Sequence, residues 1–123
     1  MATKQYFLKD KKALIYRKYE GGGTGKSTSY VPLTASALWC YTRQLTEAQI
    51  FAARIYLDDE TRLFVFNFRD DIQQYDVIRY KESWYSVTRV DTMDDYNGEV
   101  FVYVKNIKIN PKQDQIKPFG YEP

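Results

Sequence analysis

Thr61–Asn106, TRLFVFNFRDDIQQYDVIRYKESWYSVTRVDTMDDYNGEVFVYVKN, contains four successive runs rich in Val, Ile, Tyr, Phe and Trp. Polar turn residues bound each run, as is typical of short β-strands. Apolar side chains recur at every second position of the first and last runs: Phe64, Phe66 and Phe68, then Val100, Val102 and Val104. Because the side chains of a β-strand alternate between its two faces, residues that recur at every second position lie on the same face of a sheet. The stretch therefore predicts an antiparallel meander at the centre of an all-β fold.

The dipeptide Asn97-Gly98 lies between the third and fourth runs. Asn-Gly readily adopts the positive φ angles of a tight two-residue hairpin turn. We therefore expect Trp84–Asp91 to pair antiparallel with Glu99–Asn106. The face that carries Phe64, Phe66 and Phe68 is predicted to point into the core, rather than the face that carries Leu63 and Val65. The expected core residues are Phe66, Val87, Val100, Val102 and Val104.

The 123-residue chain has one cysteine, Cys40, and no histidine. These counts exclude a disulfide within the chain and a zinc site of the usual Cys/His kind. We expect a small antiparallel β-barrel or sandwich over residues 1–110 and a flexible tail over residues 111–123. No segment has the apolar length of a membrane span, and the first residues do not resemble a signal peptide. We therefore expect synthesis in a reducing cytoplasm and no association with a membrane.

The net charge of +2 is unevenly distributed. Residues 1–26 hold seven Lys and Arg against two acidic residues, whereas residues 27–106 have an acidic excess of four. A basic amino end on an acidic body suits contact with nucleic acid or with an acidic patch on a neighbouring subunit. Lysines that blunt the exposed edge of a solvated strand explain the same pattern. The sequence leaves both interpretations open.

A glycine-rich segment follows Lys12–Tyr19, the predicted first strand. Residues 20–29, EGGGTGKSTS, resemble a phosphate-binding P-loop, in which backbone N–H groups hold phosphates and a lysine reaches them. That pattern requires glycine where Glu20 stands and a helix after the loop, and Pro32 disfavours the helix. We therefore expect a flexible hairpin loop, no nucleotide binding and no effect of Lys26→Ala on the fold.

Two further segments connect these strands. Leu33–Arg43 is predicted to form the second strand, with Cys40 as a small apolar residue of the core or of a sheet edge. Leu45–Leu57 changes to helical spacing after a capping box, which predicts a short helix or a long excursion that is helical only when docked. After Asn106 the chain holds three of its four prolines. The tail is therefore predicted to be extended or dependent on a partner, without apolar residues for a core.

Catalytic groups are not indicated by the sequence. Without histidine there is no Ser-His-Asp or Cys-His arrangement. Three acidic pairs are expected at strand ends, where carboxylates are ordinarily solvated: Asp58/Asp59, Asp70/Asp71 and Asp94/Asp95. The spacing from Asp91 to Glu99 does not match a calcium loop. We expect no enzymatic activity, no cofactor and no metal.

Three short segments of the meander follow one another closely: FRDDI at 68–72, YDVIRY at 75–80 and WYSV at 84–87 with Val90. They resemble segments of the phage head-tail joining (head-tail adaptor, head closure or stopper) proteins. In that family a strand ends near an R-x-x-I motif, a D-R-I-x-Y strand follows, and a Y-x-I-x-x-V strand completes the hairpin. Trp39 matches a tryptophan-bearing strand, and Glu47 matches a glutamate in a linking stretch. The resemblance covers residues 12–106, although Asp76-Val77 stands where the family has Asp-Arg.

The resemblance implies a structural role in a virion. Copies are expected to form a homo-oligomeric, twelvefold ring below the portal-adaptor complex, which closes the DNA-filled head and presents a surface to tail-completion or tail proteins. The protein would occupy the host cytoplasm before assembly and then the virion, with contact to packaged DNA left open. Three segments are predicted to become ordered when they bind such partners: the glycine-rich loop, the Leu45–Leu57 excursion and the Pro111–Pro123 tail. Their partner-contact residues are Gly21, Gly22, Gly23, Thr24, Gly25, Lys26, Glu47, Gln49, Phe51, Arg54, Phe119 and Tyr121.

A nucleic-acid-binding barrel similar to an OB-fold is the alternative from another class. Such barrels combine a basic groove with aromatic side chains on which bases stack. In this sequence the basic residues concentrate at the amino end, whereas the acidic turns lie in the aromatic meander. An accessory domain of an enzyme is a third, weaker alternative.

Overall fold

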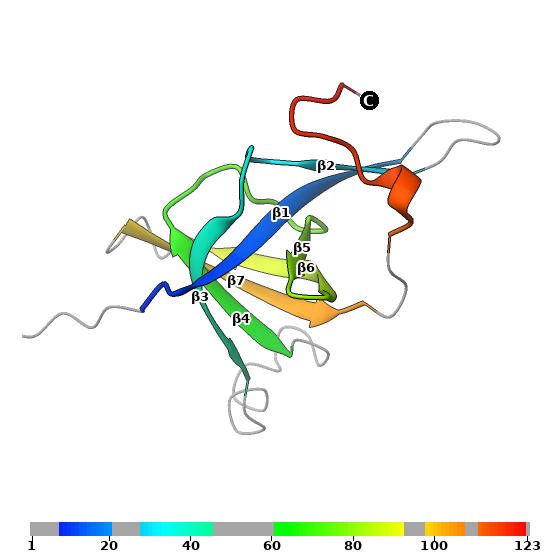
Figure 1. Ribbon diagram of the computed structural model, residues 1–123. Helices are drawn as coiled ribbons and strands as arrows, with labels where there is room; N and C mark the ends of the chain where they lie inside the picture. The colour runs from blue at the N-terminus through cyan, green and yellow to red at the C-terminus, as the bar shows by residue number, and fades with distance from the viewer. Residues whose placement is uncertain (1–7, 21–27, 46–60, 93–97, 108–110, 123) are drawn as a thin grey trace, which may run out of the picture.

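The computed structural model describes residues 8–20, 28–45, 61–92, 98–107 and 111–122, and it is almost entirely β (Figure 1). Seven strands and one 3-10 turn make up the described elements: β1 (Lys11–Glu20), β2 (Thr28–Pro32), β3 (Leu38–Gln44), β4 (Arg62–Asn67), β5 (Val77–Tyr80), β6 (Ser83–Asp91), β7 (Glu99–Asn106) and η2 (Gln113–Gln115). The all-β prediction is therefore confirmed. The expected helix over Leu45–Leu57 lies almost wholly outside the described residues.

Six of the strands form a closed antiparallel barrel, in the order β1-β3-β4-β7-β6-β5. Strand β1 closes it by pairing on both sides. Its residues Lys11–Ala13 pair with β3, and Leu14–Tyr16 pair with β5. Closure leaves few free strand edges, which otherwise invite uncontrolled pairing. The second half of β1 continues beyond the barrel and pairs with β2, forming a projecting hairpin.

The prediction of one strand over Leu33–Arg43 is wrong in its boundaries. Strand β2 comes earlier, at Thr28–Pro32, and β3 begins only at Leu38. Between them the chain bends, and the Thr34 hydroxyl donates a hydrogen bond to the Ser36 carbonyl at 2.6 Å. Small polar residues form such local bonds in place of sheet pairing. The glycine-rich segment therefore connects two antiparallel strands, whereas a P-loop leads into a helix.

The barrel interior contains all five residues predicted for the core. Each belongs to one buried cluster, together with Ile15, Cys40, Phe64 and Ile78 among others. Leu63 and Val65 alternate with the inward phenylalanines and so lie on the outer face of β4, yet both are buried. Both faces of β4 are therefore covered. Phe68 follows the end of the strand and is 38% exposed, so its predicted place in the core is wrong.

The thiol of Cys40 is fully buried in this cluster, which confirms its prediction as an apolar residue. Burial away from water disfavours the thiolate and raises the pKa of Cys40 to about 12. The side chain therefore acts as a small apolar group at neutral pH.

The predicted pairing of β6 with β7 is confirmed, but the turn is longer than expected. Asp91 lies opposite Phe101, so the connection is longer than a two-residue turn. Gly98 has a φ of +66°, and its carbonyl accepts a hydrogen bond from the Phe68 N–H at 2.8 Å. Asn97 lies outside the described residues. The positive φ at Gly98 therefore occurs at the end of a connection between β6 and β7 that is longer than the predicted two-residue turn.

Replacing Gly98 with valine is expected to destabilise the protein by about 1 kcal/mol, because a β-branched side chain resists positive φ. An added Cβ meets nothing within 4 Å, so steric clash is not the cause. Chemical denaturation of wild type and variant measures the change. A Gly98→Asn variant, which tolerates this backbone conformation better, should lose less. An unchanged midpoint for the valine variant would contradict the proposed strain.

A second apolar cluster lies outside the barrel. It contains the buried side chains of Tyr16, Val77 and Trp84, and partly buried Leu14, Tyr30, Ile107 and Ile116 pack against them. Ile116 reaches it because the C-terminal segment forms a parallel bridge with β2, Tyr30 to Ile116, and the Lys117 N–H donates to the Tyr30 carbonyl at 2.9 Å. The expectation that the tail lacks apolar residues for a core is therefore wrong at Ile116. Its flexibility remains a prediction.

Candidate functional site

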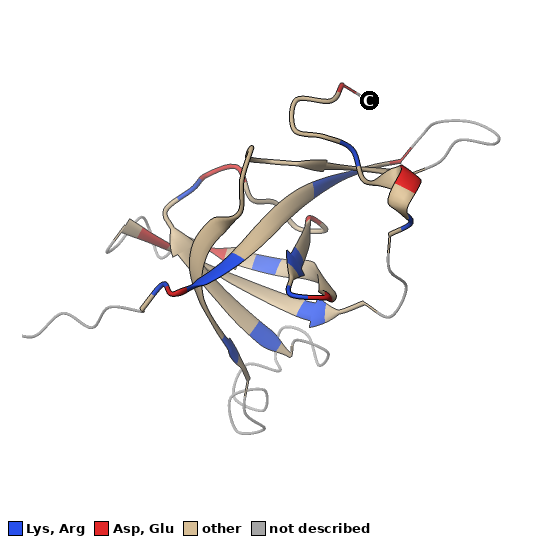
Figure 2. Cartoon of the chain, in the orientation of Figure 1, with Lys and Arg blue, Asp and Glu red and all other residues tan. Residues whose placement is uncertain are grey.

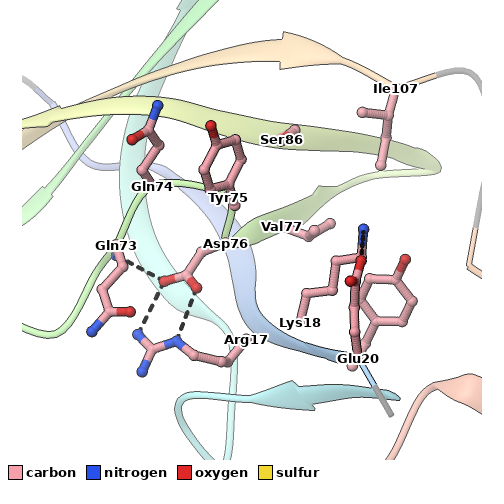
Figure 3. A pocket seen from close by; sticks show the side chains of 11 residues that line it. Arg17, Lys18, Glu20, Gln73, Gln74, Tyr75, Asp76, Val77, Ser86 and Ile107 are labelled. Carbon is pink, nitrogen blue, oxygen red and sulfur yellow. Dashed lines mark hydrogen bonds and ion pairs between the residues drawn. The ribbon is translucent and has the colours of Figure 1, made fainter. Parts of the chain in front are cut away.

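A cleft of about 520 Å³ lies between the β1–β2 hairpin and the barrel wall (Figure 3). Strand β1 contributes Arg17, Lys18 and Glu20 to one side. The turn before β5 contributes Gln73–Asp76 to the other, and Val77 and Ile107 are among its apolar lining residues. The cleft has the size of a small ligand site, but charged and amide side chains line much of it.

The cleft opens where two paired strands diverge. Strands β1 and β5 pair as far as Tyr16 and Val77. Beyond this point β1 continues to Glu20 and pairs with β2, whereas the chain before β5 leaves the sheet through Tyr75, whose φ is +74°. The Tyr75 N–H donates instead to the Val87 carbonyl on β6 at 2.9 Å. The cleft therefore forms where the backbones of these two segments separate.

An ion pair forms the inner wall of the cleft. Arg17 donates from Nε to Oδ1 of Asp76 at 2.9 Å and from Nη2 to Oδ2 at 3.1 Å. The Asp76 side chain is buried and also accepts the Gln73 N–H at 2.8 Å. Hydrogen bonding to this carboxylate raises the pKa of Arg17. A bidentate pair with a third donor fixes the turn against β1.

A second ion pair extends this network to the surface. Arg17 also donates to the Asp71 carbonyl, while the Asp71 side chain accepts from Arg69 Nε at 2.9 Å and Nη2 at 2.6 Å. The hydrogen bonds from Arg69 lower the pKa of the Asp71 carboxyl, with partial desolvation opposing them. The expected solvation of the Asp70/Asp71 pair is therefore incomplete at Asp71.

We expect Asp71→Asn to change how stability depends on pH. The folded-state pKa of Asp71 is lowered. The contribution of Asp71 to the free energy of unfolding is therefore present above about pH 4 and is lost as the pH falls through the folded-state pKa. Near neutral pH the loss should be below about 1 kcal/mol, because the pair is partly exposed. Wild type and variant should converge at lower pH in denaturation measurements. Asp70→Asn, at the exposed neighbouring position, serves as the matched control variant.

The charged side chains that line the cleft are held in ion pairs. The Lys18 ammonium lies 3.2 Å from the Glu20 carboxylate, and Arg17 binds Asp76. Among the residues that the structure describes, no group of three His, Cys, Asp or Glu side chains is placed to hold a metal ion. The cleft therefore offers amides, hydroxyls and paired charges for binding.

Most of the predicted contact residues cannot be placed. Residues 21–26 lie outside the described residues, as do Glu47, Gln49, Phe51 and Arg54. Phe119 and Tyr121 are described and are 56% and 39% exposed, so both are available to a partner. Neither lines the cleft.

The Arg17–Asp76 pair is not predictable from the sequence pattern. The two residues are 59 positions apart, and no local pattern connects them. A basic residue on the first strand and an aspartate before the meander hairpin were the only available signals. The exposure of Trp39 and Phe68, which line a second recess, is likewise not indicated by the sequence.

Comparison with protein-family models and with curated proteins gives no match to this chain. Within the described ranges, no helix has the length and apolar character needed to cross a membrane.

Proposed function

We propose that this protein is a structural component of a tailed-phage virion, a head closure or head-tail joining protein. It would act as a ring below the portal-adaptor complex, where it retains packaged DNA and presents a surface for the tail. The resemblance of residues 12–106 to that family is the basis of the proposal. The resemblance implies a small antiparallel β-barrel from which a long loop and a short helical segment project, and the closed antiparallel barrel of this chain is consistent with the first of these features.

One observation carries the proposal: the segments that resemble the family form one bonded unit. Arg69 binds the Asp71 side chain, and Ile72 is buried in the barrel core. Asp76, which precedes β5, is held by Arg17 of β1. Strands β5 and β6 then pair from Val77 to Ser86. The resemblance therefore falls on a framework of the barrel and not on scattered surface residues.

A complementation experiment tests the proposal. A lysate of the phage made without this protein should contain DNA-filled heads and free tails that do not join, with some heads losing DNA. Adding the purified protein should restore joined particles in electron micrographs and raise the plaque titre. Matched buffer and a heat-denatured sample serve as controls. Normal particles without the protein, or no recovery after its addition, would overturn the proposal.

Nucleic-acid binding is the second candidate, supported by aromatic–cation pairs such as Lys12 with Trp39 and Arg89 with Tyr103. The closed barrel has six strands, however, whereas an OB-fold has five. Fluorescence anisotropy with single-stranded oligonucleotides separates the two functions. A nucleic-acid-binding protein should bind strongly and lose affinity steeply between about 50 and 200 mM salt. A joining protein should bind negligibly at both concentrations.

A further inference from the structure

An aromatic slot of about 300 Å³ lies where β3 and β4 separate. The two strands pair from Gln44 opposite Arg62 to Cys40 opposite Phe66, and beyond this pair they diverge. Trp39 is 54% exposed and Phe68 is 38% exposed beside the slot. The lining residues are Ala37, Leu38, Trp39, Phe66, Asn67, Phe68 and Arg69. An exposed tryptophan beside an apolar recess is typical of a protein-docking hot spot.

A preformed turn presents an aromatic side chain elsewhere on the chain. In this C-terminal turn, Pro118–Tyr121, the Tyr121 N–H donates to the Pro118 carbonyl at 3.1 Å. Gly120 has a φ of +87°, which glycine adopts without strain. Phe119 projects with 56% of its surface exposed, and Lys117 lies 5.3 Å from the Tyr121 ring. In Figure 1 the turn lies above β2, away from β3 and β4.

The first half of β1 carries basic residues, and the C-terminal segment carries both signs of charge (Figure 2). The Lys12 ammonium lies 4.5 Å from the centre of the Trp39 ring, at the edge of the slot. Glu122 follows the C-terminal turn and is exposed. Neither residue forms an ion pair with another described residue. An acidic group beside the inserted aromatic ring would therefore meet a cation beside the slot.

We propose that Phe119 of one copy of this chain inserts into the aromatic slot of a second copy, with Glu122 approaching Lys12. The inference rests on the proposed function and deepens it by naming the surfaces through which ring subunits contact each other. The slot has room for one aromatic side chain, and both surfaces expose large apolar groups on the same molecule. Because turn and slot are different surfaces, the contact is heterologous, and repeating it generates a ring when the rotation closes.

Mixing two variants tests the contact with full-length protein. Phe119→Ser removes the inserted ring, and Trp39→Ser removes one wall of the slot. Sedimentation velocity should show wild type associating with rising concentration, and each variant alone as a monomer with association weakened about tenfold or more. An equimolar mixture should form dimers and nothing larger, because only the intact turn of one variant and the intact slot of the other can meet.

Further variants separate docking from folding. Tyr19→Ser removes an exposed aromatic side chain outside the slot, the C-terminal turn and the cleft, and should associate as wild type does. Thermal unfolding midpoints should stay near that of wild type, because the replaced side chains are exposed. Lys12→Glu should weaken association without removing an aromatic ring, and adding Glu122→Lys in the same chain should restore it. This pair keeps the test valid even if Trp39→Ser fails to fold.

Three results would overturn the inference: a wild type that stays monomeric at every concentration, single variants that associate as wild type does, or a mixture that stays monomeric. Failure of the proposed function is distinguishable, because association is measured on purified protein without heads or tails. Association through the slot without recovery in the phage lysate would leave the contact standing and reject the joining role. If the protein restores joined particles in the lysate but associates independently of Phe119 and Trp39, the joining role stands and the proposed contact is rejected.

Discussion

Arg17→Ala should destabilise the protein by about 3–5 kcal/mol, because it leaves the buried Asp76 carboxylate without its cation. The guanidinium supplies two hydrogen bonds to Asp76 and another to the Asp71 carbonyl. After truncation, the Gln73 N–H is the remaining described donor to the Asp76 side chain. The turn that forms one wall of the cleft should then loosen. Urea denaturation followed by tryptophan fluorescence measures the loss, since Trp84 lies in the adjacent apolar cluster.

The matched control is Lys18→Ala, the next residue on the same strand. Lys18 pairs with Glu20 on the surface, where such pairs contribute at most about 1 kcal/mol. An Arg17→Met, Asp76→Leu double variant should recover part of the loss, because replacing both partners removes the uncompensated charge. An Arg17→Ala variant within about 0.5 kcal/mol of wild type would show that Asp76 does not depend on this cation.

Phe64→Ala should cost about 3–5 kcal/mol through the cavity it leaves in the barrel core. Phe64 is fully buried at the centre of an aromatic group. Its ring centre lies 6.1 Å from that of Phe66, 5.7 Å from Tyr80 and 5.6 Å from Tyr85. Because these neighbours come from three strands, the loss should lower the cooperative midpoint of the whole barrel. Thermal and urea denaturation measure this change.

Phe68→Ala provides the comparison within the same sequence pattern. Phe68 continues the alternation of Phe64 and Phe66 but lies beyond the end of β4 and is 38% exposed. Its truncation should cost no more than about half as much, because 38% of its surface is already exposed and the space that it leaves is open to water. Equal losses for the two variants would mean that Phe68 belongs to the core in solution. The comparison thus tests where the barrel interior ends.

The packing of Ile116 in the C-terminal segment is not predictable from the sequence. Its prolines and polar residues indicate an extended tail, and one isoleucine in such a segment gives no periodic signal. The structure nevertheless places Ile116 against the cluster around Trp84, by way of a single bridge to Tyr30. A lone apolar residue is a core residue only if a distant surface accepts it. That information is absent from the local sequence.

The sequence by itself determined the antiparallel meander, the pairing of β6 with β7 and the inward face of β7. Alternation of Val100, Val102 and Val104 specifies a half-buried strand, because a shift by one residue would turn every valine outward. Gly98 marks a position where the chain needs positive φ. These are local properties, readable within a few residues of one another.

Only the tertiary structure decided how the barrel closes and where its surfaces lie. Pairing of β1 with β5 joins residues far apart in the chain, and it is what brings Arg17 to Asp76. The same closure determines where β3 and β4 separate to expose Trp39. Burial of both faces of β4 likewise contradicts the simple alternation of its sequence. Such contacts depend on the relative placement of whole strands, and residue spacing along the chain does not encode that placement.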